Sequence, residues 1–463
     1  RNHNPRVGGS SPSSATKNET INFILEFFMS VGTTLRSGHS ARKISIPLFL
    51  LFFSILSQFA FSELLSKKDK EFLSTDFRVS YHPTAINIID GKDIFTAFYM
   101  SEHSTDPKKA HKKLNLNHPP GYPVFIALNY KLADILDFER LVFLKIVETI
   151  IYGLSALVLF LILNLFFSYY DSVFGTMLWI INPLNLWLTR QPHSEIPFYL
   201  FFFLSLFFFF RMRAKKSSFY LILFSIGVAI TIYLRSAAIF LPIVCLLVAL
   251  YSSTVSEPRT YSFTQKLGII ILPYLLIAPW ITFISVEQKS FIPMTTSGQI
   301  MMYNGLTYVV KKGDSEFIEA PLEVRSLIAR ISDNLNAKSF DEKRIGVKTI
   351  IIQNLINDPY ASMKLIFIKF IKSTHATFSK RDETKIFIFN LVFFVLVSYG
   401  LFSTQKNTYS KLSILFALYS FALCILTFPL IRYMLPALGL FSVYVSISVR
   451  RIFFVLTKLA LKS

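Results

Sequence analysis

Residues 196–216 have the sequence IPFYLFFFLSLFFFFRMRAKK, and this stretch decides the fold class of the chain. Eight of its residues are Phe, and four basic residues follow the apolar run. A water-soluble core cannot cover so many neighbouring Phe side chains, whereas the hydrocarbon of a bilayer accepts them on every side of a helix. The basic residues that follow are typical of a cytoplasmic loop between two membrane spans.

The composition of the whole chain agrees with this stretch. Of its 463 residues 52% are hydrophobic and 16% are charged, and Phe alone occurs 49 times. The mean hydropathy is +0.49, and an average soluble protein is about 25% charged. These values exclude a disordered, fibrous or collagen-like chain. Cys245 and Cys424 both lie in apolar stretches, which excludes a disulfide framework.

The net charge of +20 raises the question of nucleic acid as a partner. The basic residues lie mainly in short loops between apolar segments, where they orient a membrane protein. No basic patch with interleaved aromatic residues lies outside the membrane region. We therefore expect membrane lipid as a partner and no nucleic acid.

The apolar segments predict an all-α polytopic membrane protein with about ten transmembrane helices, since one span takes about 20 apolar residues. The predicted spans are 46–64, 147–167, 173–188, 196–210, 218–234, 236–251, 267–285, 385–403, 412–430 and 433–449.

One further apolar segment, 121–136, is short and carries Asn129, Lys131 and Asp134. The positive-inside rule decides how it lies. With ten spans and a cytoplasmic N-terminus, the basic loops at 211–216, 406–411 and 450–451 all face the cytoplasm. An additional span at 121–136 would place all of them outside. We therefore predict an interfacial helix there, and cytoplasmic N- and C-termini.

The same pattern gives the expected domain organisation. The sequence before Met29 resembles a translated 3′ end of a tRNA gene, so we expect synthesis to start at Met29 and residues 1–28 not to be translated. Short helices are expected at 321–331 and 342–356, where apolar residues follow a helical period. The predicted parts are a cytoplasmic leader (1–45), an N-terminal transmembrane catalytic module (46–285) with a first outer loop (65–145), a large extracytoplasmic loop (286–384), and C-terminal transmembrane helices with a cytoplasmic tail (385–463).

Polar residues that a simple anchor would not need gather in the outer loops. The first outer loop contains Asp76 and Tyr81, followed by Asn117-His118-Pro119-Pro120-Gly121-Tyr122-Pro123. Three prolines and one glycine fix a rigid, non-helical backbone there. Such a backbone serves equally well to hold Asn117 and His118 against a ligand or merely to turn the chain.

Three further places carry charge at the same membrane face. His193 and Glu195 precede an apolar span, where the acid can simply favour the N-terminus of a helix. Arg235 lies between two apolar stretches, where an ionisable residue has a partner, a function, or a side chain that reaches the interface. Arg432-Tyr433 occupies the same kind of place. A carboxylate near an acceptor hydroxyl can act as a general base, and cations can hold a phosphate leaving group.

Motifs of soluble enzymes do not occur in the sequence. There is no Gly-rich phosphate loop, HExxH, paired CxxC or GxSxG. His103, His111, His118 and His193 lack the spacing of metal ligands, and no acidic cluster demands a metal ion. We therefore expect neither a bound metal nor another cofactor.

These residues resemble the GT-C superfamily of membrane glycosyltransferases, in the branch of dolichyl-phosphate-mannose–protein mannosyltransferases and bacterial aminoarabinose transferases. The resemblance runs from Ile46 to the C-terminus. Asp76 is followed by Phe77 where many relatives have a second acid, and His118 stands where some relatives have Lys. The carriers are Asp76, Tyr81, Ala85 and Gly91; His118 to Pro123; Ser194-Glu195; Arg235; Pro293 to Gly298 with Asn304-Gly305; Asp358-Pro359 with Lys364 and Lys369; and Arg432-Tyr433 with Pro436.

The resemblance implies a fold whose first outer loop forms interfacial helices over a cavity open to lipid. It implies transfer of a sugar, with inversion, from a polyprenyl-phosphate carrier to an acceptor hydroxyl of a glycan, lipid or protein at the outer face. Asp76 would act as the base and Glu195 would assist it. The carrier phosphate would be bound by His118, Arg235 and Arg432. The complete set of expected substrate-binding residues is Tyr81, Asn117, His118, His193, Arg235, Arg432 and Tyr433.

Two other classes stay open as alternatives. A polysaccharide polymerase or ligase has related chemistry and differs mainly in the size of its donor. A transporter of lipid-linked glycans would need polar or broken helices at mid-membrane, whereas the spans here are apolar. The composition and the leader suggest a bacterium, which predicts the inner membrane and an undecaprenyl-type carrier. The sequence leaves open the sugar, the acceptor and the oligomeric state.

Overall fold

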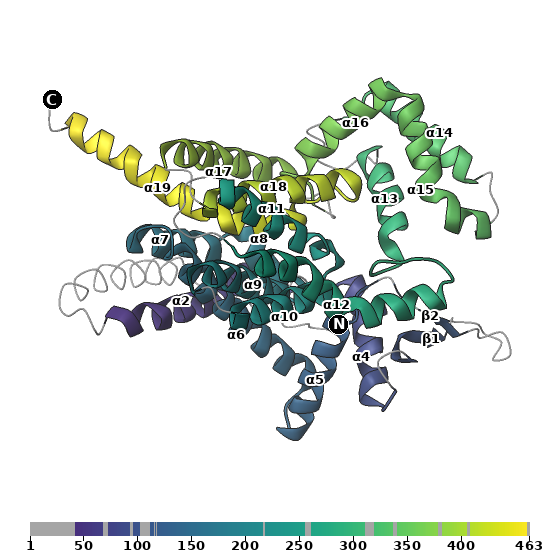
Figure 1. Cartoon of the computed structure of the whole chain (residues 1–463), viewed down its shortest axis with the longest axis horizontal. Coiled ribbons are helices and arrows are strands. Elements are labelled where there is room, and N and C mark those ends of the chain that lie inside the picture. The colour runs from purple at the N-terminus through teal and green to yellow at the C-terminus, as the bar shows by residue number, and fades with distance from the viewer. Residues whose placement is uncertain are drawn as a thin grey trace, which may run out of the picture. The chain divides into compact units, whose positions relative to one another are not determined.

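The computed structural model describes residues 42–67, 73–92, 96–101, 112–114, 116, 118–215, 218–254, 261–310, 319–336, 340–377, 382–404 and 408–460 (Figure 1). The chain divides into two compact units, residues 1–50 and 51–463. Every contact discussed below lies within the second unit. The two cysteines predicted to be free are free and buried.

Seven of the described helices are long and apolar enough to cross a membrane. Two shorter apolar helices, α10 (Ser218–Leu234) and α11 (Leu241–Thr254), accompany them. The all-α polytopic class predicted from the sequence is confirmed. The seven are α2 (Arg42–Leu64), α6 (Arg140–Leu163), α9 (Glu195–Lys215), α12 (Phe263–Glu287), α17 (Glu383–Ser403), α18 (Thr408–Leu426) and α19 (Leu435–Ala460).

The predicted span at 173–188 is not one continuous helix. It is divided into α7 (Tyr169–Ile180) and α8 (Pro183–Thr189). The break lies at Asn182, whose side-chain oxygen accepts a hydrogen bond from the backbone N–H of Leu184 at 3.0 Å. An Asn followed by Pro begins a helix well, because Pro lacks only an N–H that the first turn leaves unpaired anyway. The exact number of spans therefore stays a prediction.

The helices differ in how much of their surface other helices cover. The apolar stretches of α6, α9 and α19 are mostly buried, whereas those of α2 and α17 are mostly exposed. Helices α6, α9 and α10 pack side by side (Figure 1). Lipid is as apolar as these side chains, so close backbone approach stabilises such packing more than hydrophobic burial does. At Gly175 on α7, an added Cβ would lie 2.9 Å from the Cα of Val443 on α19.

The first outer loop contains short elements and then the predicted interfacial segment, which is a helix, α5 (Gly121–Ile135). Two three-residue strands pair antiparallel in this loop, with Tyr99 opposite Leu114, and are the only strands in the described residues. The short elements are the π-helical turn η1 (Phe77–Tyr81), α4 (His82–Ile89), the 3₁₀ turn η2 (Thr96–Phe98), β1 (Tyr99–Ser101) and β2 (Lys112–Leu114).

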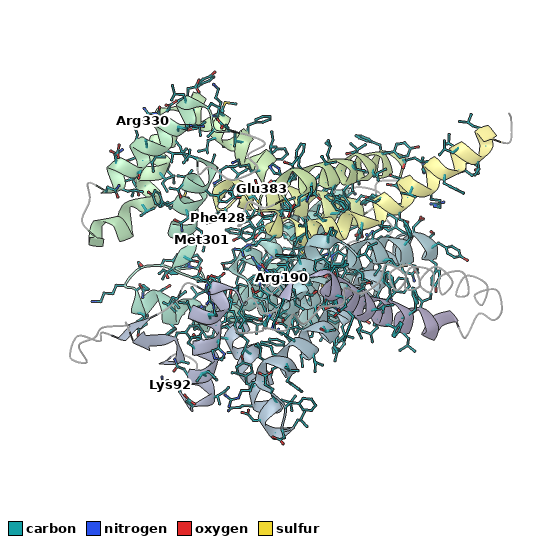
Figure 2. The ribbon with its side chains drawn as sticks, turned by 180° about the vertical axis from the view of Figure 1, so that it is seen from behind. Lys92, Arg190, Met301, Arg330, Glu383 and Phe428 are labelled. Atoms are coloured by element: carbon teal, nitrogen blue, oxygen red, sulfur yellow. The ribbon has the colours of Figure 1, made fainter. Side chains whose placement is uncertain are left out.

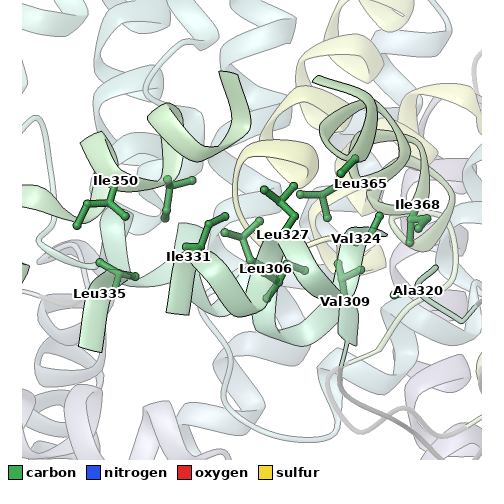
Figure 3. Packing of buried hydrophobic residues seen from close by; sticks show 13 residues of the cluster. Leu306, Val309, Ala320, Val324, Leu327, Ile331, Leu335, Ile350, Leu365 and Ile368 are labelled. Carbon is green, nitrogen blue, oxygen red and sulfur yellow. The ribbon is translucent and has the colours of Figure 1, made fainter. Parts of the chain in front are cut away.

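The large outer loop folds into four helices around an apolar cluster of their own (Figure 3). Leu306, Leu327, Ile351 and Leu365 come one from each helix and lie in this cluster. The helices predicted at 321–331 and 342–356 are confirmed by α14 and α15. The four helices are α13 (Ser297–Val310), α14 (Leu322–Asn336), α15 (Phe340–Asn357) and α16 (Pro359–Lys372).

A second, smaller cluster joins this loop to the last two spans. Tyr308 on α13 packs there with Phe428 and Leu430, which follow α18, and with Met301 (Figure 2). The backbone N–H of Ile431 donates to the carbonyl of Ala376 at 3.0 Å. Ile431 begins the 3₁₀ turn η4 (Ile431–Tyr433). The outer loop therefore holds the short segment that carries Arg432.

Candidate functional site

The predicted site residues come from four separate places in the chain. Asp76 precedes η1, Glu195 begins α9, Arg235 follows α10, and Arg432 lies in η4. A glycine brings one of these places close to α5: a Cβ added at Gly121, the first residue of α5, would lie 2.6 Å from the backbone carbonyl of Tyr233. The start of α5 therefore contacts the backbone two residues before Arg235.

Glu195 is the most enclosed acid of the site, with 2% of its surface exposed. Its carboxylate forms an ion pair with the guanidinium of Arg235 and a hydrogen bond with the ring of His193. The hydroxyl of Ser194 donates to the same carboxylate at 3.2 Å. A buried carboxylate is tolerated only when it is paired and hydrogen-bonded in this way. Glu195 therefore does more than favour a helix N-terminus.

Arg235 has an extended backbone and lies between α10 and the 3₁₀ turn η3 (Ser236–Ala238). Besides its ion pair with Glu195, its guanidinium lies 5.4 Å from the ring centroid of Tyr433 and 5.9 Å from that of Phe198. The sequence left open whether Arg235 has a partner, a function or a side chain that reaches the interface. In the structure it has a partner, Glu195, and aromatic rings lie around the pair.

Asp76 and His118 form the second acid–base pair of the site. Nε2 of His118 lies 3.8 Å from Oδ1 of Asp76, and the Asp76 side chain is 48% exposed against 19% for His118. Nδ1 of His118 shares a hydrogen bond of 3.1 Å with the hydroxyl of Tyr81. Burial lowers the pKa of His118 below its usual 6.5, although the charge of Asp76 opposes this shift. His118 is therefore neutral near pH 7, and Asp76 remains accessible to an acceptor.

Tyr81 lies between the two acids. Burial and the negative charge of Asp76 raise the pKa of its phenol, and Glu195 adds to this effect. The ring of Tyr81 meets the ring of Tyr122 edge to face, with centroids 4.9 Å apart. The phenol therefore stays protonated and can donate or accept hydrogen bonds between the Asp76 and Glu195 sides.

Arg432 presents unsatisfied hydrogen-bonding capacity to the site. One terminal nitrogen donates to the hydroxyl of Tyr433 at 3.3 Å. Its Nε is buried and has no hydrogen-bond partner within the described part of the chain. Because a buried donor without a partner is unfavourable, this guanidinium is suited to receive an anion.

A pocket that is partly open to solvent lies beside these charges and has an apolar wall. The hydroxyl of Tyr419 on α18 donates to the carbonyl of Ala237, which joins two of its walls. The residues that line it include Glu195, Arg235 and Arg432 as well as Phe416, Leu423 and Pro436, and the surface that it exposes is mostly apolar.

Sequence reasoning missed one acid next to the site, Glu148 on α6. It is 4% exposed. One carboxylate oxygen accepts a hydrogen bond from the Tyr122 hydroxyl at 2.7 Å, and the other accepts from the backbone N–H of His193 at 3.2 Å. The available signal was an acidic residue inside an apolar span, which favours a function by itself.

The structure thus brings together most of the residues predicted from the sequence. Asn117 lies outside the described residues. Within the ranges that the structure describes, no group of three His, Cys, Asp or Glu side chains could hold a metal ion. The residues with contacts around the two acids are Tyr81, His118, His193, Arg235, Arg432 and Tyr433.

Comparisons with known proteins agree with this arrangement. Residues 117–283 match the family model of dolichyl-phosphate-mannose-protein mannosyltransferase. That region contains His118, Glu148, Glu195 and Arg235. No curated protein matches the sequence.

Among solved structures, the fold is similar to that of the Archaeoglobus fulgidus oligosaccharyltransferase, a GT-C enzyme. The form tethered to an acceptor peptide has a TM-score of 0.50 and 11% identity, covering 88% of this chain and 49% of that chain. The apo form has a TM-score of 0.47 and 11% identity, covering 90% and 52%. The chain thus spans about half the length of that enzyme. The family match over residues 117–283 bears out the resemblance inferred from the sequence and supports a membrane glycosyltransferase, and the likeness to the solved structures is one of fold.

Proposed function

We propose that this chain is a membrane glycosyltransferase of the GT-C type that moves a sugar from a polyprenyl-phosphate carrier to an acceptor hydroxyl. One observation carries the proposal: the pocket is lined by Arg235 and Arg432 together with apolar side chains of α18. A phosphate joined to a long hydrocarbon chain needs both kinds of surface side by side. The buried Nε of Arg432, which lacks a partner within the described residues, supports phosphate binding there.

In this reaction Asp76 acts as the general base. Its carboxylate takes the proton of the acceptor hydroxyl while that oxygen forms a bond to the anomeric carbon of the sugar. The bond from this carbon to the phosphate oxygen breaks, and its electron pair leaves with the phosphate, which stays on the lipid. A single displacement of this kind inverts the configuration at the anomeric carbon. The 48% exposure of Asp76 suits a group that must meet an incoming acceptor.

The remaining residues assist the two ends of the reaction. Arg432 stabilises the charge that develops on the leaving phosphate, and Arg235 is held beside it by Glu195. His118 is neutral near pH 7, so it orients Asp76 and binds substrate through hydrogen bonds rather than as a permanent cation. Tyr81, His193 and Tyr433 line the substrate-binding region. The acceptor is a glycan, a lipid or a protein.

The proposal includes a location for the reaction. The basic loops at 211–216 and 450–451 face the cytoplasm, and both termini lie on that side. The active site then opens to the extracytoplasmic face of the inner membrane.

A transfer assay tests the proposal. Purified wild type and Asp76→Asn receive a panel of radiolabelled polyprenyl-phosphate sugars together with an envelope extract as the source of acceptor. We expect transfer by the wild type and a loss of about 10²–10⁴-fold in Asp76→Asn, with binding of the carrier retained. Asp90→Asn is the matched control, because Asp90 is an exposed acid of the same loop.

The outcomes separate the parts of the proposal. Equal turnover by wild type and Asp76→Asn would remove Asp76 as the base. Folded wild type that transfers no sugar from any donor would overturn the proposed transfer from a polyprenyl-phosphate sugar and favour a polymerase, a ligase or a transporter.

A further inference from the structure

Glu148 has an unusual position for an acid in a membrane-spanning helix. It lies on α6, near the helix end that starts at Arg140, and is almost completely buried. Its two carboxylate oxygens serve two different partners, the Tyr122 hydroxyl on α5 and the backbone N–H of His193 before α9. The carboxylate therefore joins two segments that carry opposite sides of the site.

On one side the connection leads toward the proposed base. The Tyr122 ring packs edge to face against Tyr81, with centroids 4.9 Å apart at 88°. The Tyr81 hydroxyl is 3.1 Å from Nδ1 of His118, and Nε2 of His118 is 3.8 Å from Asp76. Glu148 thus influences the place of Asp76 through side chains that are already in contact.

On the other side the connection leads toward the proposed phosphate site. His193, whose backbone N–H Glu148 holds, pairs through its ring with Glu195. Glu195 in turn pairs with Arg235. A change in the His193 backbone therefore moves the carboxylate that orients this guanidinium.

We infer that Glu148 is a positioning residue that sets the distance between the base and the leaving phosphate. This inference rests on the proposed function. Glu148 does not contact the pocket that the donor occupies, so it acts through Tyr122 and His193. A displacement of about 1 Å between reacting groups can lower a rate by about 10²-fold while binding persists.

Glu148→Gln, Glu148→Asp and Tyr122→Phe test the inference. Gln keeps the shape but replaces one acceptor oxygen with an NH₂ donor, so while its carbonyl oxygen accepts from the His193 N–H, the Tyr122 hydroxyl can no longer donate to it and has to accept instead. We expect Glu148→Gln to lower kcat by about 10²-fold, with KM for the donor changed by less than about threefold. Glu148→Asp keeps two acceptor oxygens and should recover part of this loss. Tyr122→Phe keeps the ring against Tyr81 and removes only the hydroxyl.

A double-variant comparison identifies the route of the effect. If Tyr122 transmits part of the effect of Glu148 on kcat, Tyr122→Phe lowers kcat when Glu148 is present but changes kcat little in the Glu148→Gln background. Glu139→Gln is the matched control: Glu139 caps the N-terminus of the same helix through Leu141 and Val142 and does not touch the site. Glu139→Gln should alter the stability of α6 and leave kcat equal to that of the wild type.

Each result decides between the alternatives. An active wild type whose folded Glu148→Gln variant keeps its kcat, or raises only KM, overturns the inference and leaves the function intact. If Glu148→Gln and Glu139→Gln lose kcat equally, the role of Glu148 is purely structural, and this also overturns the inference. If Glu148→Gln does not fold, Tyr122→Phe decides alone, and an unchanged kcat there overturns the connection to Asp76. A wild type inactive with every donor overturns the proposed function first and the inference with it.

Discussion

The buried pair of Glu195 and Arg235 allows a prediction of stability. Replacing Arg235 with Gln leaves the Glu195 carboxylate, 2% exposed, with hydrogen bonds from His193 and Ser194 and the nearby charge of Arg432. Removing one partner of a buried ion pair lowers the free energy of unfolding by about 3–5 kcal/mol, because the remaining charge stays out of water. We expect Arg235→Gln to lose an amount in this range.

The loss should depend on the remaining charge rather than on the missing arginine. Glu195→Gln combined with Arg235→Gln removes both charges and should therefore be more stable than Arg235→Gln alone. The free energies are measured by reversible unfolding in mixed detergent micelles, with helicity as the signal. The matched control is Arg140→Gln, because Arg140 forms an exposed pair with Asp134 at 2.7 Å. Exposed pairs contribute little, so this change should have a much smaller effect.

Two results would refute the reasoning. Equal losses for Arg235→Gln and Arg140→Gln would mean that burial does not strengthen the dependence of Glu195 on its partner. A double variant less stable than Arg235→Gln would mean that the guanidinium acts through packing against Tyr433 and Phe198 rather than through the charge of Glu195.

Three further predictions follow from other contacts. Arg432→Gln should weaken binding of a polyprenyl phosphate about 10-fold or more, since a hydrogen bond to a charged group contributes about 1.5–3 kcal/mol. Calorimetric titration measures the affinity, and an unchanged affinity would place the phosphate elsewhere. Gly121→Ala should lower transfer and thermal stability, because its Cβ would lie 2.6 Å from the Tyr233 carbonyl, whereas Gly298→Ala, with no atom within 4 Å, should leave both unchanged; equal effects would contradict this. Burial lowers the pKa of Lys369 on α16 to about 7, and the unfolded chain keeps the ordinary value of 10.5. The unfolded state therefore binds the extra proton in this window, so stability should rise from pH 7 toward 10 in wild type and rise less in Lys369→Met; parallel unfolding curves would exclude Lys369 as the cause.

Parts of the site could be predicted because their signals are local. Arg235 and Arg432 stand out as charges between apolar spans, and Glu195 stands out at the start of one. The break at Asn182 is different: its signal, an Asn followed by Pro, is present in the sequence, but the apolar run around it predicts one span. The two helices predicted at 321–331 and 342–356 from apolar periodicity are present as α14 and α15, although their ends differ by a few residues.

The sequence by itself determined that the chain is an all-α membrane protein and where most of its apolar helices lie. Hydrophobicity and basic loops suffice for this, because the bilayer selects helices by local composition. Only the tertiary structure decided which charges pair: Glu148 meets Tyr122 and His193, which are 26 and 45 residues away in the chain. It also decided that Arg235 has an acid beside it while Nε of Arg432 lacks a partner among the described residues. The reason is that such pairs depend on helix packing, which local composition does not specify.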